Sequence, residues 1–187
     1  MKINKLLVSA LLISNAFYFS IIVAAELPTD SIYQLRSKWI TQDNTQLQLK
    51  KLSGKQQIVS LIYTNCLHTC PTIVSTMQEI ERGLTLAEKK TIGFVLISLT
   101  PESDTPKVLK AFAEKRQLNL EHWILLSGKN MDVRSLAMAL NIKYKTVENN
   151  EVEHSNLLTV LDPQGRILFQ QIANIDKSEQ VINRLRK

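Results

Sequence analysis

The chain has 187 residues, enough for one domain of ordinary size behind a leader. With 44% hydrophobic and 21% charged residues, its composition is that of a globular protein and excludes a disordered chain. The net charge of +6 is spread over short basic clusters such as Lys50-Lys51 and Lys89-Lys90. Scattered clusters of this size favour a solvated surface and argue against a nucleic-acid partner.

Residues 1–25 are typical of an export leader. Lys2 and Lys5 precede a run from 6 to 25 without any charge, and the small residues Val23-Ala24-Ala25 stand before Glu26. The run suits either a cleaved signal peptide or a retained N-terminal membrane anchor. Both alternatives place a domain of residues 26–187 outside the cytoplasm, in the periplasm or on the outer face of the cytoplasmic membrane.

The rest of the chain alternates strand and helix patterns. The predicted elements, in order, are a hairpin of 39–42 and 47–49, a buried strand 58–63, a helix 71–84, a strand 92–99, a helix from Pro106 to Ala113, a strand 123–126, a helix 133–140, a hairpin of 157–161 and 167–171, and a last helix capped by Ser178. Asp104 or Thr105 is the expected N-cap of the helix at Pro106. This order predicts an α/β domain with a central mixed sheet flanked by helices.

Cys66 and Cys70 are the only cysteines, and they lie between the buried strand and the helix that begins near Pro71. A disulfide between them would close a loop with only three intervening residues, which makes a poor structural staple. Thiols at a helix N-terminus also ionise more easily than others. The pair therefore indicates redox or metal chemistry.

Two thiolates on this spacing suit a soft metal ion, Cu(I) first and Zn(II) as a competitor. An imidazole could complete a three-coordinate site, but His154 follows Cys70 by 84 residues, and spacing alone favours a surface or packing role for it. His68, between the cysteines, is expected to point elsewhere. Met77, Met131 and Met138 fit apolar helix faces and are expected in the core.

Three blocks of the sequence resemble the Sco/SenC family. Residues 62–71 match its YTxCxxxCP signature, residues 97–106 its SxDPxxDTP segment, and residues 153–155 with 161–165 its DHS and DPxG block. The blocks occur in the family's order over residues 39–172.

The resemblance implies a thioredoxin-like fold and one copper ion per chain, as Cu(I) or Cu(II), held by Cys66, Cys70 and His154. It implies a metallochaperone that assembles the copper A centre of cytochrome c oxidase. The implied partners are the oxidase's copper subunit or another exported copper enzyme, together with a copper donor or a thiol-reductant protein.

A thiol–disulfide oxidoreductase acting on an exported copper enzyme is the alternative. Cys66 would attack the partner's disulfide and Cys70 would resolve the mixed disulfide, without need of His154. A peroxide-reducing enzyme is disfavoured, because Thr64 stands two residues before Cys66 instead of three.

The chain departs from the family pattern at three positions. Leu67 replaces proline, Thr100 replaces aspartate, and Glu153 replaces the aspartate before the histidine. Glu153 keeps a carboxylate that could orient the imidazole of His154.

Overall fold

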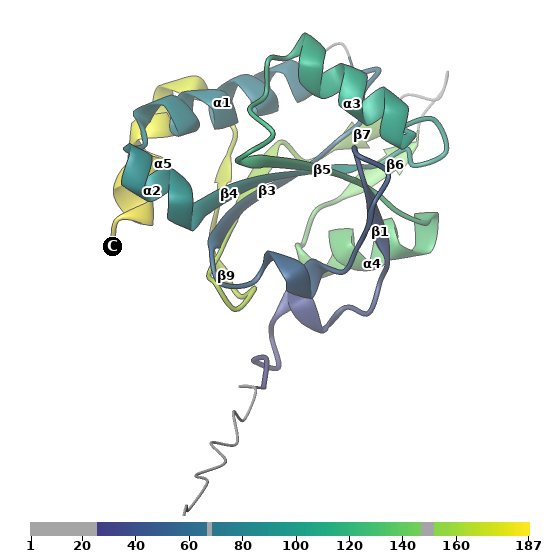
Figure 1. Ribbon diagram of the computed structural model, residues 1–187, viewed down its shortest axis with the longest axis horizontal. Helices are drawn as coiled ribbons and strands as arrows, with labels where there is room; N and C mark the ends of the chain where they lie inside the picture. Colours follow the sequence, from purple (N-terminus) through teal and green to yellow (C-terminus); the bar gives the residue numbers. More distant parts are fainter. Residues whose placement is uncertain (1–25, 67–68, 147–151) are drawn as a thin grey trace, which may run out of the picture.

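The computed structural model describes residues 26–66, 69–146 and 152–187, which form one central sheet covered by helices on both faces (Figure 1). The predicted leader at 1–25 lies outside the described residues, so its presence, cleavage and anchoring stay predictions. Within the described part of the chain, none of the helices combines the length and apolarity that crossing a membrane requires.

The main sheet has seven strands in the order β2-β1-β5-β4-β3-β8-β9. The central strands β3, β4 and β5 run parallel, and β1, β2, β8 and β9 pair antiparallel at the two edges. A separate two-stranded sheet consists of β6 and β7. The strands are β1 (Trp39–Thr41), β2 (Gln46–Leu47), β3 (Gln56–Ile62), β4 (Ile92–Ser98), β5 (Trp123–Ser127), β6 (Tyr144–Thr146), β7 (Val152–His154), β8 (Leu157–Leu161) and β9 (Ile167–Ile172).

The helices form two layers around this sheet. The α-helices are α1 (Thr69–Gly83), α2 (Leu86–Thr91), α3 (Pro106–Lys115), α4 (Asn130–Ala139) and α5 (Ser178–Leu185). In Figure 1, α1 and α3 lie on one side of the sheet and α4 on the other, and α5 packs beside α1. Parallel neighbours connected by right-handed crossovers, as in β3-α1-β4 and β4-α3-β5, place both connecting helices on the same face.

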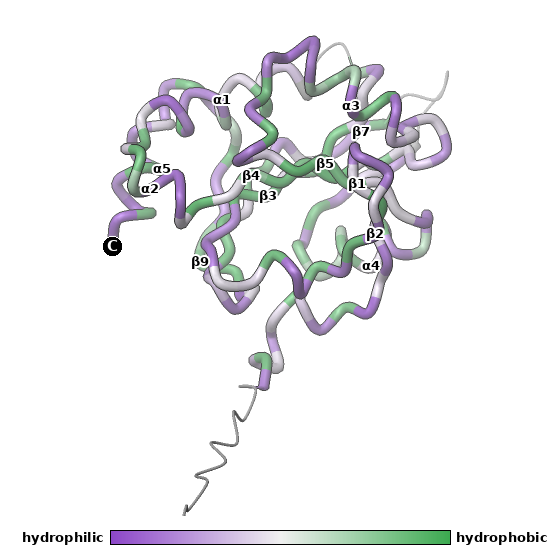
Figure 2. The backbone as a smooth tube through the Cα atoms, viewed as in Figure 1, coloured by the Kyte–Doolittle hydropathy of each residue, from purple (hydrophilic) through white to green (hydrophobic). Residues whose placement is uncertain are grey.

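The core is centred on the parallel strands, which appear as the green, hydrophobic centre of Figure 2. From Gln57 to Ile62 every side chain of β3 is buried, because helices cover one face of the sheet and α4 the other. Phe94 of β4 stacks on Trp123 of β5 with the ring centroids 4.8 Å apart. The sheet is therefore a firm base for the turns that leave its strand ends.

The predicted mixed α/β fold and the N-terminal hairpin are confirmed, but helix α2 and strands β6 and β7 were not predicted. Helix α2 has only six residues and no buried side chain, so it has no apolar face to detect. Its start is fixed instead by a reciprocal capping box between Thr85 and Glu88. Strands β6 and β7, which were also not predicted, have only three residues each.

Several detailed predictions were wrong. Ser178 is the first residue of α5 and not its cap, which is Lys177. Met131 and Met138 are each 80% exposed, whereas Met77 is fully buried as predicted. Val108, expected on the inner face of α3, is also exposed. In α3 and α4 the buried face of the helix is therefore narrower than the set of apolar residues in its sequence.

Candidate metal centre

Cys66 lies in a turn at the end of β3. Beyond Ile62 the chain still follows the sheet, since the Leu99 N–H donates to the Ile62 carbonyl at 2.7 Å. The Cys66 N–H then donates to the Tyr63 carbonyl at 3.2 Å, which closes a tight turn. Only 6% of Cys66 is exposed. The predicted order of a strand, a cysteine and a helix along the chain is therefore observed. Cys66 lies at the carboxyl end of a buried parallel strand.

Cys70 is the second residue of α1, which begins at Thr69. Its backbone is therefore in the first turn of the helix, where peptide N–H groups point out of the helix end. His68 lies outside the described residues.

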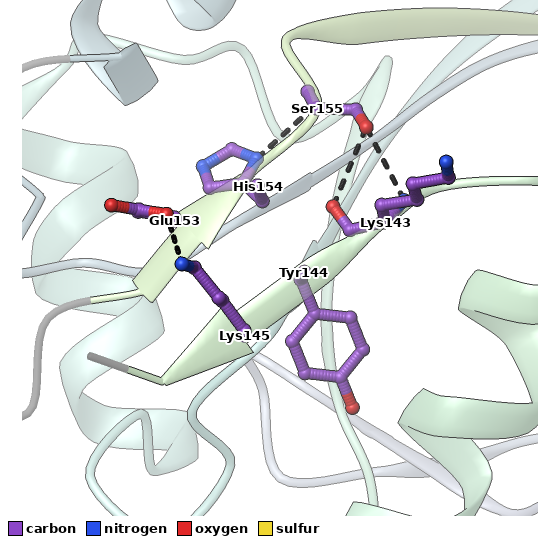
Figure 3. Close-up of a pocket in the computed structure, with 6 residues that line it drawn as sticks. All are labelled: Lys143, Tyr144, Lys145, Glu153, His154 and Ser155. Carbon is purple, nitrogen blue, oxygen red and sulfur yellow. Dashed lines mark hydrogen bonds and ion pairs between the residues drawn. The ribbon is translucent and has the colours of Figure 1, made fainter.

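His154 is the last residue of β7 and pairs across the hairpin with Tyr144 of β6 (Figure 3). The following residue, Ser155, adds a hydrogen bond between the two segments at the open end of the hairpin, because its N–H donates to the Lys143 carbonyl at 2.9 Å. The hairpin borders a pocket of about 430 Å³ lined by Lys143, Tyr144, Lys145, Glu153, His154 and Ser155.

Tyr63 connects the cysteine turn to His154. The two rings meet edge to face, with their centroids 6.2 Å apart and their planes at 78°. A second pocket, of about 380 Å³, is bordered both by Tyr63 and Asn65 from the turn and by Val152 from β7. The fold therefore brings Cys66 and His154, 88 positions apart, to the same end of the sheet.

The environment of His154 suits a neutral imidazole. Burial lowers the pKa of His154, and the hydrogen bond with the Ser155 carbonyl, 3.2 Å from Nδ1, raises it by less. A neutral ring that donates from Nδ1 to a carbonyl presents Nε2 as the nitrogen for a metal. An imidazole nitrogen and a thiolate sulfur are borderline and soft donors, and both are donor types that suit copper.

Glu153 does not have the orienting role expected of it. Its carboxylate pairs with Lys145 at 3.1 Å, directly across the hairpin, because adjacent residues of a strand point to opposite faces (Figure 3). The hydrogen bond at Nδ1 of the imidazole is made with the Ser155 carbonyl. Among the side chains that the structure describes, no three His, Cys, Asp or Glu residues are grouped as metal ligands.

Sequence reasoning missed the role of Asp104. Thr105 is the N-cap of α3, and the Asp104 carboxylate turns inward, fully buried, among the hydroxyl groups of Thr64, Ser98 and Thr100. An acid just before a helix start is typical of a cap, so only the hydroxyl residues spaced along 98–100 could have indicated this network.

Comparisons with known proteins agree with this geometry. The sheet order, the thiol turn after a central strand and the helix that follows define a thioredoxin-like protein. The SCO1/SenC family model matches residues 29–187, and the chain belongs to that family.

Two curated relatives illustrate the match. The chain is 28% identical over 130 residues to a SCO1 protein homolog of Bacillus subtilis, covering 68% of this chain and 67% of the relative. It is 26% identical over 132 residues to a Stutzerimonas stutzeri protein named as a candidate copper-binding protein, covering 68% and 63%. The chain thus spans about two thirds of each relative's length.

Two solved structures share the fold. A SCO1/SenC family lipoprotein from Bacillus anthracis superposes with a TM-score of 0.73 at 25% identity, covering 80% of this chain and 90% of that one. BsSco, described as a member of the Sco family of cytochrome c oxidase assembly proteins with a disulfide switch, has a TM-score of 0.69 at 25% identity, covering 80% and 88%. The thioredoxin-like fold is therefore confirmed.

Proposed function

We propose that this protein is an exported copper-binding assembly factor that holds one copper ion through Cys66, Cys70 and His154. The observation that carries the proposal is the ring contact of Tyr63 with His154, because Tyr63 is also the residue whose carbonyl closes the Cys66 turn. That contact brings a histidine 84 residues beyond Cys70 next to the turn that carries Cys66.

The residues contribute in different ways. Cys66 is a nearly buried residue, which disfavours competition by solvent for an ion bound there. Cys70 is placed in the first turn of α1, where the helix dipole favours the thiolate form that binds soft metals. His154 offers a nitrogen that is neutral near pH 7, since burial lowers its pKa.

The copper is cargo, and the proposed recipient is the copper A centre of cytochrome c oxidase or another exported copper enzyme. The family membership, the copper-binding name of the Stutzerimonas stutzeri relative and the oxidase-assembly description of BsSco support this role. The leader at 1–25 and the lipoprotein nature of the Bacillus anthracis neighbour support export.

A thiol–disulfide oxidoreductase is the second candidate, favoured by the disulfide switch of BsSco. The Cys66 thiolate would attack a disulfide of the partner and release one partner thiolate. The Cys70 thiolate would then displace the second one, leaving a Cys66–Cys70 disulfide and a partner reduced by two electrons. In this chemistry His154 transfers no electron or proton.

Competitive titration of the anaerobically reduced protein with Cu(I), against a chelator of known affinity, tests the copper proposal. We expect one ion per chain, and a loss of affinity of at least about 100-fold in Cys66→Ser and Cys70→Ser, beyond what loss of an outer-shell partner costs. Met138→Leu, which removes an exposed thioether, is the control and should bind as wild type. Undiminished one-to-one binding in either cysteine variant would refute the proposal.

A further inference from the structure

Asp104 lies where three segments meet at the cysteine end of the sheet. It is fully buried, and its neighbours come from the Cys66 turn, the end of β4 and the loop before α3. The Thr64 hydroxyl donates to Oδ1 at 2.6 Å, and the Thr64 N–H donates to Oδ2 at 3.2 Å. The hydroxyls of Ser98 and Thr100 donate to Oδ2 at 2.6 and 3.0 Å.

A carboxylate without exposure is stable only when hydrogen bonds replace its water. Here both oxygens accept, and two of the four donating groups belong to a single residue, Thr64. Hydrogen bonds to a charged acceptor are shorter and stronger than neutral ones, and two of these are 2.6 Å long. The network therefore fixes Thr64 by both its main chain and its side chain.

Thr64 is two residues before Cys66 and inside the turn that the Cys66 N–H closes. Asp104 is itself held at the start of α3, since its own N–H donates to the Thr100 carbonyl at 2.9 Å. The position of the Cys66 turn is thus set by hydrogen bonds to the end of β4 and to the loop before α3.

We infer that Asp104 is a positioning residue for the proposed metal centre. It acts through Thr64 to hold the Cys66 thiol in position to bind copper. The inference rests on the proposed function, because it assigns the turn a purpose beyond stability. Thr100, which stands where the family has aspartate, belongs to the same network as a donor, but its hydroxyl donates to Asp104 and lies outside the turn sequence.

This difference between Thr64 and Thr100 provides a matched test. Thr64→Val and Thr100→Val each remove one hydroxyl donor from the same carboxylate, at similar volume. If Asp104 only stabilises the fold, both variants should lose similar stability and similar copper affinity. If it positions Cys66, only Thr64→Val should lose affinity beyond its loss of stability.

The experiment measures the urea midpoint and the Cu(I) dissociation constant of the whole protein for wild type, Thr64→Val, Thr100→Val and Thr64→Ser. We expect Thr64→Val to bind Cu(I) about tenfold more weakly, as for loss of an outer-shell partner, and Thr100→Val to stay within about threefold of wild type. Thr64→Ser keeps the hydroxyl and should restore affinity. Equal losses in both valine variants, or wild-type affinity in Thr64→Val, would overturn the inference.

A second measurement separates this inference from the proposed function. In a Cys70→Ser background, the rate at which iodoacetamide alkylates Cys66 reports the position of that sulfur without any metal. We expect Thr64→Val to change this rate at least threefold, Thr100→Val to leave it within twofold and Thr64→Ser to restore it. A protein that fails to bind Cu(I) but shows this pattern would refute the proposed function and support the positioning role, and equal rates in all variants would refute the positioning role.

Discussion

Two regions contribute the candidate ligands, and they are built in contrasting ways. The Cys66 turn follows β3, a strand that is paired on both sides. Thr64 in this turn donates hydrogen bonds to the buried carboxylate of Asp104. His154 comes from β6 and β7, two strands of three residues that pair with each other outside the main sheet. A hairpin of that size has little stability of its own.

The two regions are therefore stabilised by different parts of the molecule. The thiol side is set by the core of the domain, whereas the imidazole side depends on a few contacts, chiefly Tyr63 against His154 and the buried Val152. Changes in the core should therefore disturb both sides, and changes at the hairpin should disturb the imidazole side alone.

The largest expected effect comes from the core beneath the thiol side. Leu96 of β4 is 1% exposed, so Leu96→Ala should lower the free energy of unfolding by about 2–5 kcal/mol through lost burial and a cavity. Urea denaturation measures this. Leu86→Ala, at a side chain 82% exposed, should stay within about 0.5 kcal/mol, and a similar loss in both variants would contradict the assigned core.

The second largest effect is expected from substitution of Tyr63, because this residue joins the two regions. Tyr63→Leu keeps an apolar side chain but loses the edge-to-face contact with His154, which is worth about 0.5–1.5 kcal/mol. Hydrogen exchange should become faster in β6 and β7 and stay unchanged in β3 and β4. Tyr63→Phe retains the ring and is the control. Slow exchange of the hairpin in Tyr63→Leu would show that the contact does not hold it.

His154 should make stability depend on pH. Burial lowers its folded-state pKa below 6.5, so as pH falls through 6.5 the unfolded chain takes up a proton that the folded imidazole does not. The stability of wild type should fall over that window, and the stability of His154→Gln should fall less. Urea midpoints at about pH 7.5 and about pH 5.5 measure this. Parallel profiles would contradict a buried neutral imidazole.

The smallest effect should come from the hairpin's outer face. Lys145 and Glu153 form an ion pair whose side chains are 69% and 65% exposed, so Lys145→Ala should cost at most about 0.5 kcal/mol. The difference from wild type should vanish in about 1 M salt, where charges are screened within a few ångströms. A loss that persists in high salt would assign Lys145 a packing role instead.

The same contrast explains what the sequence could predict. The buried strands β3 and β4 and the helix α1 carry long apolar patterns, and the cysteines lie within a few residues of both, so local reasoning located them. Strands β6 and β7 are too short for a periodic pattern. The contact of Tyr63 with His154 joins positions 91 apart, so only the family resemblance pointed to His154.

Asp104, Met131 and Met138 show a second limit. Local patterns assign a residue to a helix start or an apolar face, but tertiary contacts decide which way its side chain turns. The hydroxyl groups of Thr64, 40 positions away, and of Ser98 and Thr100 nearby draw the Asp104 carboxylate inward. Of the two predicted caps of α3, Thr105 is the one observed. The narrow buried stripe of α4 leaves both methionines outside it.

The central claim is that the turn and the hairpin together form one copper site. X-ray absorption of the Cu(I)-loaded protein tests it most directly, with His154→Ala measured beside wild type. We expect two sulfur donors and one nitrogen donor on each copper ion in wild type, and loss of the nitrogen with both sulfurs retained in the variant. An all-sulfur shell in wild type, or a nitrogen that persists in His154→Ala, would contradict it.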